Sequence, residues 1–204
     1  MSSAFIAPSL YKLFDTYSGN QSLKPETNQS LEFGGSLFFS NGGQFQLVYF
    51  SRDHQNFVEY DMTTFRYTNA PRDFGVYGTE FLCSYPLTDR LLLQTNYTYT
   101  QHEEGEGLRI PKHKVNASFR QQLNSNTQLL TSIQFVGDRD DKVGQDLVVL
   151  SSYWLLDFRI SHQLSQPGVS LFGSIENVFD ANYEEVSGYT TRGRNLSVGV
   201  SYAF

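Results

Sequence analysis

The last ten residues, NLSVGVSYAF (195–204), alternate between large apolar side chains and small or polar ones. One side of this stretch carries Leu196, Val198, Val200, Tyr202 and Phe204, and the residues between them are Ser, Gly or Ala. Successive side chains of a β-strand point to opposite faces, so this period of two predicts a strand with one apolar and one polar face.

The same alternation recurs along most of the chain. We predict strands at about 27–39, 43–61, 74–86, 91–101, 113–123, 126–136, 152–164, 168–178 and 194–204. Short turns and longer segments separate these strands in alternation, and the longer segments lie near 62–73, 102–112, 137–151 and 179–193. An antiparallel up-and-down sheet with short turns at one end and long loops at the other is typical of an outer-membrane β-barrel.

The composition of the 204 residues agrees with this all-β interpretation. Charged residues make up 18% of the chain and aromatic residues 15%, whereas ordinary soluble domains carry roughly 25% charged residues. The mean hydropathy is nevertheless negative, at −0.38, because uncharged polar residues are abundant. No window approaches the roughly 18 consecutive apolar residues that a membrane-spanning helix needs. The composition therefore excludes a disordered chain and a transmembrane helix.

Charge and cysteine content exclude further classes. The net charge of −6 leaves no basic surface for nucleic acid. The single cysteine, Cys83, excludes an internal disulfide and a cysteine-based zinc site. The four histidines are scattered, without an HExxH motif, and no GxSxG nucleophile motif occurs. We therefore predict no catalytic, cofactor-binding or metal-binding residue, and no enzyme activity.

The densest group of carboxylates falls in one of the long loops. Its members are Asp138, Asp140, Asp141 and Asp146. Carboxylate oxygens are the ligands that Ca²⁺ prefers, but the spacing does not fit an EF-hand loop, which needs acids at positions 1, 3 and 5 and a glutamate at 12. A calcium site is therefore not expected here.

Several local motifs resemble TonB-dependent outer-membrane receptors. Residues 5–14 and Leu23-Lys24-Pro25-Glu26 resemble the region that precedes a barrel strand in that family. Three further segments are similar to elements of the same barrel: the strand starts at 75–80 and 111–114, and the strand at 91–100. The segment from Asn177 to Asp180, with Tyr183 and Gly193-Arg194, resembles its last external loop. The resemblance covers all 204 residues and is closest to the cobalamin, siderophore and colicin receptor branch.

The resemblance implies a fold and a function. Residues 1–204 are expected to form about nine strands of a 22-stranded barrel, as the C-terminal portion of a receptor whose plug domain and signal peptide are absent here. The family imports scarce bulky nutrients, such as ferric siderophores or cobalamin, across the outer membrane of Gram-negative bacteria. The implied partners are outer-membrane lipid, the bulky ligand and, through the missing plug, the TonB system. Tyr202 and Phe204 resemble the signal read by the outer-membrane insertion machinery.

Two groups of residues are the candidates for functional contacts. On the polar side of their strands, charged residues are expected to face the lumen and the plug, or only a solvated wall: Glu32, Glu80, Arg120, Asp157, Arg159 and Glu176. In the external loops, aromatic residues are expected to stack on a ligand, or only to pack the loops: Tyr67, Phe74, Tyr183 and Tyr189.

Other interpretations stay open at this point. Nine strands of a wide barrel leave two edges without hydrogen-bond partners, which is costly in lipid. The chain is therefore part of a longer receptor, closes into a narrower barrel, or pairs edge to edge with another copy. The rival functions are a small closed outer-membrane barrel acting as an enzyme or adhesin, and a soluble β-sandwich binding module.

Overall fold

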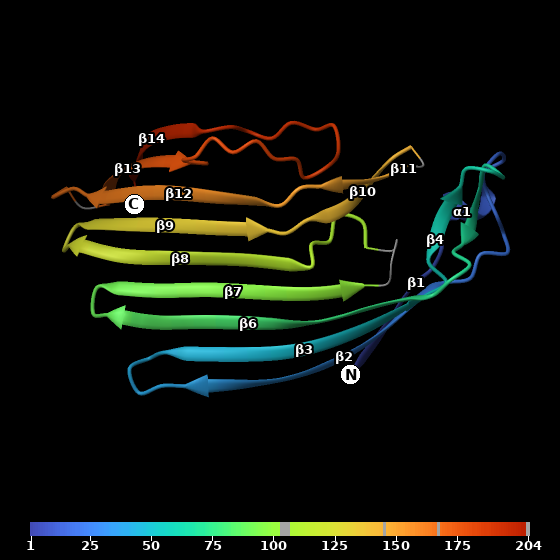
Figure 1. Cartoon of the computed structure of the whole chain (residues 1–204), viewed down its shortest axis with the longest axis horizontal. Helices are drawn as coiled ribbons and strands as arrows, with labels where there is room; N and C mark the ends of the chain where they lie inside the picture. Colours follow the sequence, from blue (N-terminus) through green and yellow to red (C-terminus); the bar gives the residue numbers. More distant parts are fainter. Residues whose placement is uncertain (103–106, 145, 167, 203–204) are drawn as a thin grey trace. The chain divides into compact units, whose positions relative to one another are not determined.

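The computed structural model describes residues 1–102, 107–144, 146–166 and 168–202. An antiparallel sheet of ten strands dominates the fold, in the order β1-β2-β3-β6-β7-β8-β9-β12-β13-β14 (Figure 1). These strands are β1 (Ser2–Ile6), β2 (Glu26–Phe38), β3 (Gln44–Gln55), β6 (Phe74–Thr88), β7 (Leu91–His102), β8 (His113–Asn124), β9 (Thr127–Val136), β12 (Tyr153–Gln163), β13 (Val169–Glu176) and β14 (Asn195–Tyr202). Two separate hairpins and a short helix complete it: β4 (Val58–Asp61) with β5 (Arg66–Asn69), β10 (Arg139–Val143) with β11 (Asp146–Leu150), and α1 (Leu10–Phe14).

The chain divides into two compact units, each of which is described by itself. The first unit contains Met1–Phe33, Tyr49–Gly78 and the described part of the segment that begins at Gln101. The second unit contains Gly34–Val48, Thr79–Thr100 and Gly107–Phe204. Among the described residues, no helix is long and apolar enough to cross a membrane.

The register of the second unit sorts its side chains onto two faces. Gln94 lies opposite Ser118, which lies opposite Ser132, and Ser132 lies opposite Asp157. The row one residue along consists of Thr95, Ala117, Ile133 and Leu156. The next row on that face consists of Tyr97, Val115, Phe135 and Trp154. The alternation predicted from the sequence is therefore confirmed: one face is polar and the other is apolar.

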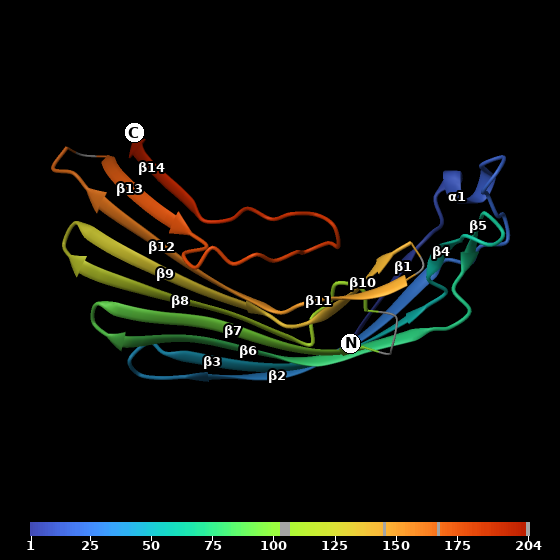
Figure 2. The ribbon, with the colours of Figure 1, turned by 45° about the horizontal axis from the view of Figure 1, so that its top comes forward.

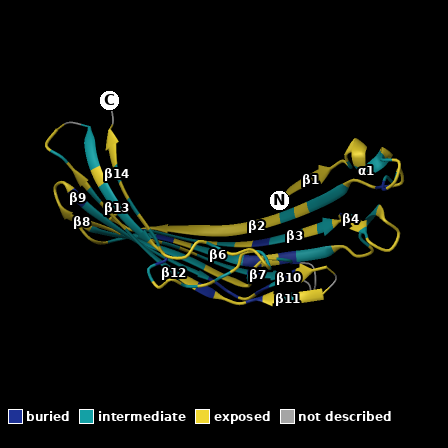
Figure 3. Cartoon of the chain, turned by 90° about the horizontal axis from the view of Figure 1, so that it is seen from above, coloured by how far each residue is buried: buried dark blue, intermediate teal, exposed yellow. Residues whose placement is uncertain are grey.

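The apolar face is open to its surroundings. Trp154 is 57% exposed, Leu196 73% and Val198 89%. Figure 3 shows exposed residues along β2 and β14 in yellow. Soluble monomeric proteins rarely expose large contiguous apolar patches. The face therefore needs an apolar environment, which a lipid bilayer supplies to the outer wall of a barrel.

In the first unit, the end with long loops forms a small cluster. The Asn20 side-chain amide donates to the Tyr67 carbonyl oxygen at 2.9 Å, and the Lys24 N–H donates to Asn69 Oδ1 at 2.9 Å. The ring of Tyr11 in α1 meets the Tyr67 ring edge-on, with centroids 6.2 Å apart. These contacts attach the segment 7–25 to the β4–β5 hairpin, and Figure 2 shows α1 next to that hairpin.

The structure differs from the sequence prediction in three places. The sheet has ten strands rather than nine, because Ser2–Ile6 pairs with Glu26–Ser30 although it shows no alternation. The predicted strand 43–61 ends at Gln55, where Asn56 adopts the left-handed conformation with φ of 56°. The segments 62–73 and 137–151, predicted as loops, contribute β5 and the β10–β11 hairpin. Each of these short strands depends on a partner, which local periodicity does not reveal.

Two neighbouring glycines of β2 test the packing of the sheet. A Cβ at Gly34 would lie 2.7 Å from the Leu47 carbonyl oxygen, whereas a Cβ at Gly35 would meet nothing within 4 Å. We expect Gly34→Ala to destabilise the sheet by about 1–3 kcal/mol, the usual cost of overpacking, and Gly35→Ala to leave it unchanged. The urea midpoint of the protein in lipid measures this. Equal midpoints for the two variants would contradict this prediction, because the backbone at Gly34 would then have shifted to make room for the methyl group.

Candidate functional site: the polar face and the long loops

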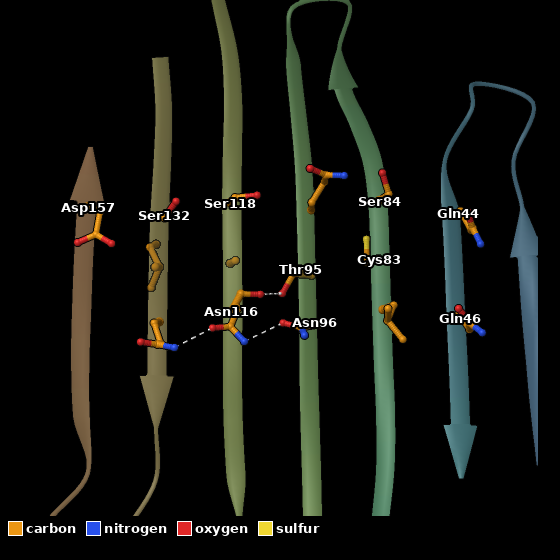
Figure 4. A pocket seen from close by; sticks show the side chains of 15 residues that line it. Gln44, Gln46, Cys83, Ser84, Thr95, Asn96, Asn116, Ser118, Ser132 and Asp157 are labelled. Carbon is orange, nitrogen blue, oxygen red and sulfur yellow. Dashed lines mark hydrogen bonds between the residues drawn. The ribbon is translucent and has the colours of Figure 1, made fainter. Parts of the chain in front are cut away.

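Amide side chains form a hydrogen-bonded row across the polar face of the second unit. The Gln134 amide donates to Asn116 Oδ1 at 3.1 Å, and the Asn116 amide donates to Asn96 Oδ1 at 3.0 Å (Figure 4). These three residues come from β9, β8 and β7. They line a shallow hollow of about 620 Å³, whose other polar lining includes Gln44, Gln46, Ser84 and Asp157. The row offers hydrogen-bonding groups that carry no charge.

Three of the predicted lumen residues lie on this same polar face. Asp157 lies opposite Ser132 and accepts a hydrogen bond from the Asn177 N–H at 2.8 Å. Arg120 and Arg159 both lie opposite Leu130, which is two residues further along β9 from the long loops than Ser132. The Arg159 guanidinium stacks on the Phe172 ring, 4.1 Å from its centroid. The wall therefore carries a row with two cations next to a row with one carboxylate.

The other predicted lumen residues are spread over both units. Glu176 in β13 accepts a hydrogen bond from the Asn195 amide at 3.3 Å. Glu32 pairs with Arg52 at 3.5 Å in the first unit. Glu80 lies in β6, in the second unit. No single cluster among the described residues unites the six.

Asp141 joins three long loops of the second unit. Its carboxylate is fully buried and accepts hydrogen bonds from Arg109 Nε, the Lys142 N–H and the Ser187 N–H, each at 2.8 Å. The N–H of Arg109 also donates to the Asp140 carbonyl oxygen at 2.7 Å. The hydrogen bond from Ser187 is the largest cause that lowers the pKa of Asp141, and the Lys142 N–H and Arg109 add to it against the effect of burial. Asp141 is therefore a carboxylate at neutral pH.

Arg139 makes a second connection between the loops. Its guanidinium donates to the carbonyl oxygens of Gly137 at 3.2 Å, of Ser151 at 3.3 Å and of Glu184. It also lies over the Tyr153 ring, 5.1 Å from the centroid. The side chain is buried, so its three carbonyl partners replace the water that it gives up. Asp141 and Arg139 together attach the loop 177–194 to the β10–β11 hairpin, at the end of the sheet shown in Figure 2.

The predicted ligand-stacking aromatics mostly pack against other rings. Tyr67 contacts Tyr60 edge-on at 5.3 Å, and Phe74 stacks on His54 at 4.7 Å, both in the first unit. Tyr183 lies against Tyr153, with ring centroids 4.2 Å apart. Tyr189 is 72% exposed. The packing interpretation thus accounts for three of these rings, and Tyr189 presents its face to solvent.

The acidic residues of the β10–β11 hairpin do not gather around a common point. Asp141 is occupied by Arg109 and two N–H groups, and Asp138 accepts a hydrogen bond from the Ser152 N–H at 2.6 Å. Among the described residues, no group of three or more His, Cys, Asp or Glu side chains is placed to hold a metal ion. Of the predicted insertion signal, Tyr202 ends β14 and Phe204 lies outside the described residues.

The sequence interpretation missed the connecting role of Arg109, Arg139 and Asp141. Asp141 stood out only as one member of an acidic cluster, and the two arginines had no motif. The amide row was accessible only in part, because the short turn between β8 and β9 fixes the register that aligns Asn116 with Gln134, whereas a long loop joins β7, which carries Asn96, to β8.

Comparisons with known proteins agree on one family. The model of the TonB-dependent receptor-like β-barrel matches residues 2–178. The vitamin B12 transporter BtuB of Vibrio cholerae is 26% identical over 208 residues, which cover 99% of this chain and 34% of the transporter. The iron-regulated outer membrane virulence protein of the same species is 27% identical over 214 residues, covering 91% of this chain and 32% of that protein.

Solved structures share the fold. The ferric enterobactin receptor PfeA of Pseudomonas aeruginosa superposes with a TM-score of 0.81 at 20% identity, over 99% of this chain and 37% of the receptor. The pyoverdine receptor FpvA of the same species also gives a TM-score of 0.81, at 19% identity, over 100% of this chain and 33% of the receptor. The chain thus spans about a third of the length of the proteins it matches.

A one-layer antiparallel sheet with an apolar outer face and a polar inner face defines an outer-membrane barrel wall. This chain belongs to the TonB-dependent receptor family and forms part of its β-barrel. The family consists of transport receptors of the Gram-negative outer membrane rather than enzymes. The soluble β-sandwich is therefore rejected.

The lowered pKa of Asp141 predicts how the loops respond to acid. A carboxylate whose pKa is lower in the folded state stabilises that state above its ordinary pKa of 3.8, and the contribution disappears as the pH falls through the folded-state value. We expect the Ser187 N–H to keep its protection from hydrogen exchange, relative to amides of β9, at neutral pH and to lose it as the pH falls below 3.8.

Substitution variants give the control for this prediction. Asp141→Asn keeps the shape but removes the charge, so protection at Ser187 is expected to be low at every pH. Asp146→Asn, in the same hairpin but exposed, should behave as the parent protein does. Full protection in Asp141→Asn would show that the carboxylate does not hold the loop.

Proposed function

We propose that residues 1–204 form the C-terminal barrel wall and external loops of a longer TonB-dependent receptor that imports a scarce bulky nutrient, such as a ferric siderophore or a cobalamin. The observation that carries this proposal is the sheet itself, which has one lipid-compatible face and one polar face and ends at β1 and β14. In hydrocarbon, each unpaired backbone group at those edges costs several kcal/mol. Further strands of the same receptor would pair with them.

The parts of the chain take separate roles in this proposal. The long loops face the outside and capture the ligand, while the polar face lines the lumen. A plug domain, supplied by the rest of the receptor, would meet Arg120, Asp157 and Arg159 on the wall and connect the receptor to TonB. The lengths of the BtuB and siderophore-receptor relatives support this division, because the chain covers 30–37% of the siderophore receptors it superposes on.

An uptake assay in cells with and without TonB tests this function. Cells that need the protein for uptake are supplied with labelled cyanocobalamin, an uncharged ferric trihydroxamate or ferric enterobactin. We expect uptake of at least one of these compounds, and expect its loss both on deletion of the gene for this protein and on deletion of TonB. Uptake that survives loss of TonB would contradict the proposal.

The terminal aromatic residue gives a separate prediction. If Tyr202 and Phe204 form the signal for the insertion machinery, Phe204→Ala should lower the amount of receptor in the outer membrane severalfold without changing the ligand affinity of the receptor that arrives. Quantitative blotting of outer-membrane fractions measures the amount, with Ala203→Ser as the control. Normal surface levels of Phe204→Ala would reject this role.

A further inference from the structure

A second cavity lies between the long loops of the second unit. It has a volume of about 450 Å³ and is formed by the end of β11, the link to β12 and the loop 177–194. Its polar lining consists of Ser151, Ser152, Asn182, Glu184, Thr190 and Thr191. Val149, Leu150 and Tyr183 add apolar surface. The size lies within the range of small-molecule sites, which also combine apolar walls with a few polar groups.

The walls of this cavity are connected without a ligand. Arg139 donates to the carbonyl oxygens of Ser151 on one wall and Glu184 on the other. The Thr191 hydroxyl donates to the Tyr183 carbonyl oxygen at 2.6 Å, within the second wall. A site whose walls are already held together loses little conformational entropy when a ligand enters. Arg139 is therefore a positioning residue for this cavity.

The charge of the cavity selects against anions. Glu184 is the one charged residue in the described lining, and it is acidic. The nearest buried cation, Arg139, is 6% exposed and does not line the cavity, and it donates hydrogen bonds to three carbonyl oxygens, two of which belong to the cavity walls. Arg192 follows Thr191 in the chain but does not line the cavity. An anionic ligand would find an acidic residue and no cation in the described lining to compensate its charge.

We propose that this cavity binds an uncharged ligand group rich in hydroxyls or amides, and that the receptor discriminates against polyanionic ligands at this point. The hydroxyls of the wall and the Asn182 amide both donate and accept, which matches groups of that chemistry. Tyr183 offers a ring next to them. The inference rests on the proposed function, in which the loops capture the imported ligand. It narrows the class of that ligand to uncharged compounds.

Binding to the full-length receptor in outer membranes tests this inference. The probes are cyanocobalamin and a ferric trihydroxamate, both uncharged, and ferric enterobactin, which is trianionic. We expect an uncharged probe to bind, with an affinity that high salt does not weaken, because no ion pair is involved. Asn182→Leu should lower that affinity about three- to tenfold, the loss of one or two hydrogen bonds. Ser187→Ala, in the same loop but outside the lining, should have no effect.

A second variant tests the charge argument directly. Glu184→Gln keeps the size of the side chain, so the uncharged probe should bind as before while binding of the anionic probe improves severalfold. Any of three results would overturn the inference. The parent protein could prefer ferric enterobactin, it could bind no uncharged probe, or Asn182→Leu and Ser187→Ala could have equal effects. TonB-dependent import of any probe is scored separately, so the proposed function can stand when the inference fails.

Discussion

Hydrogen bonding between the backbones of adjacent strands is the constraint on which this structure depends. In a bilayer no water replaces a missing partner, so a strand that crosses it must be paired on both sides. Each strand from β7 to β13 has a neighbour on both sides and meets this requirement, and the same antiparallel register fixes both faces at once. A slip of one residue would turn the polar row of Asn96, Asn116 and Gln134 toward lipid and the apolar row of Trp154 toward the lumen.

The loops of the second unit are ordered by a different kind of interaction. Two buried charged groups connect them. Asp141 collects one guanidinium and two N–H groups, and Arg139 is solvated by three carbonyl oxygens. Removing either partner of such a contact leaves a buried charge or a buried polar group without compensation, which is costly. The loops thus form a cavity whose walls are connected by hydrogen bonds.

The candidate site was partly accessible from the sequence. Alternation identified the polar face, on which Arg120, Asp157 and Arg159 lie; that they contact a plug stays a prediction. It did not show that the rings of Tyr67, Phe74 and Tyr183 pack against neighbouring aromatic side chains. It also gave no sign of Arg139, because a lone arginine in a loop has no periodic neighbours and its partners lie far away in the chain.

The sequence by itself determined the class of fold, since a period of two with alternating short and long connections is a local property of the chain. It also determined the family, through motifs spread over its length. Only the tertiary structure decided which segments become strands by pairing, as Ser2–Ile6 does with β2. It alone decided which loop residues meet: the contact of Asp141 with Ser187 joins residues 46 positions apart, and such a contact arises when strand pairing brings two loops together.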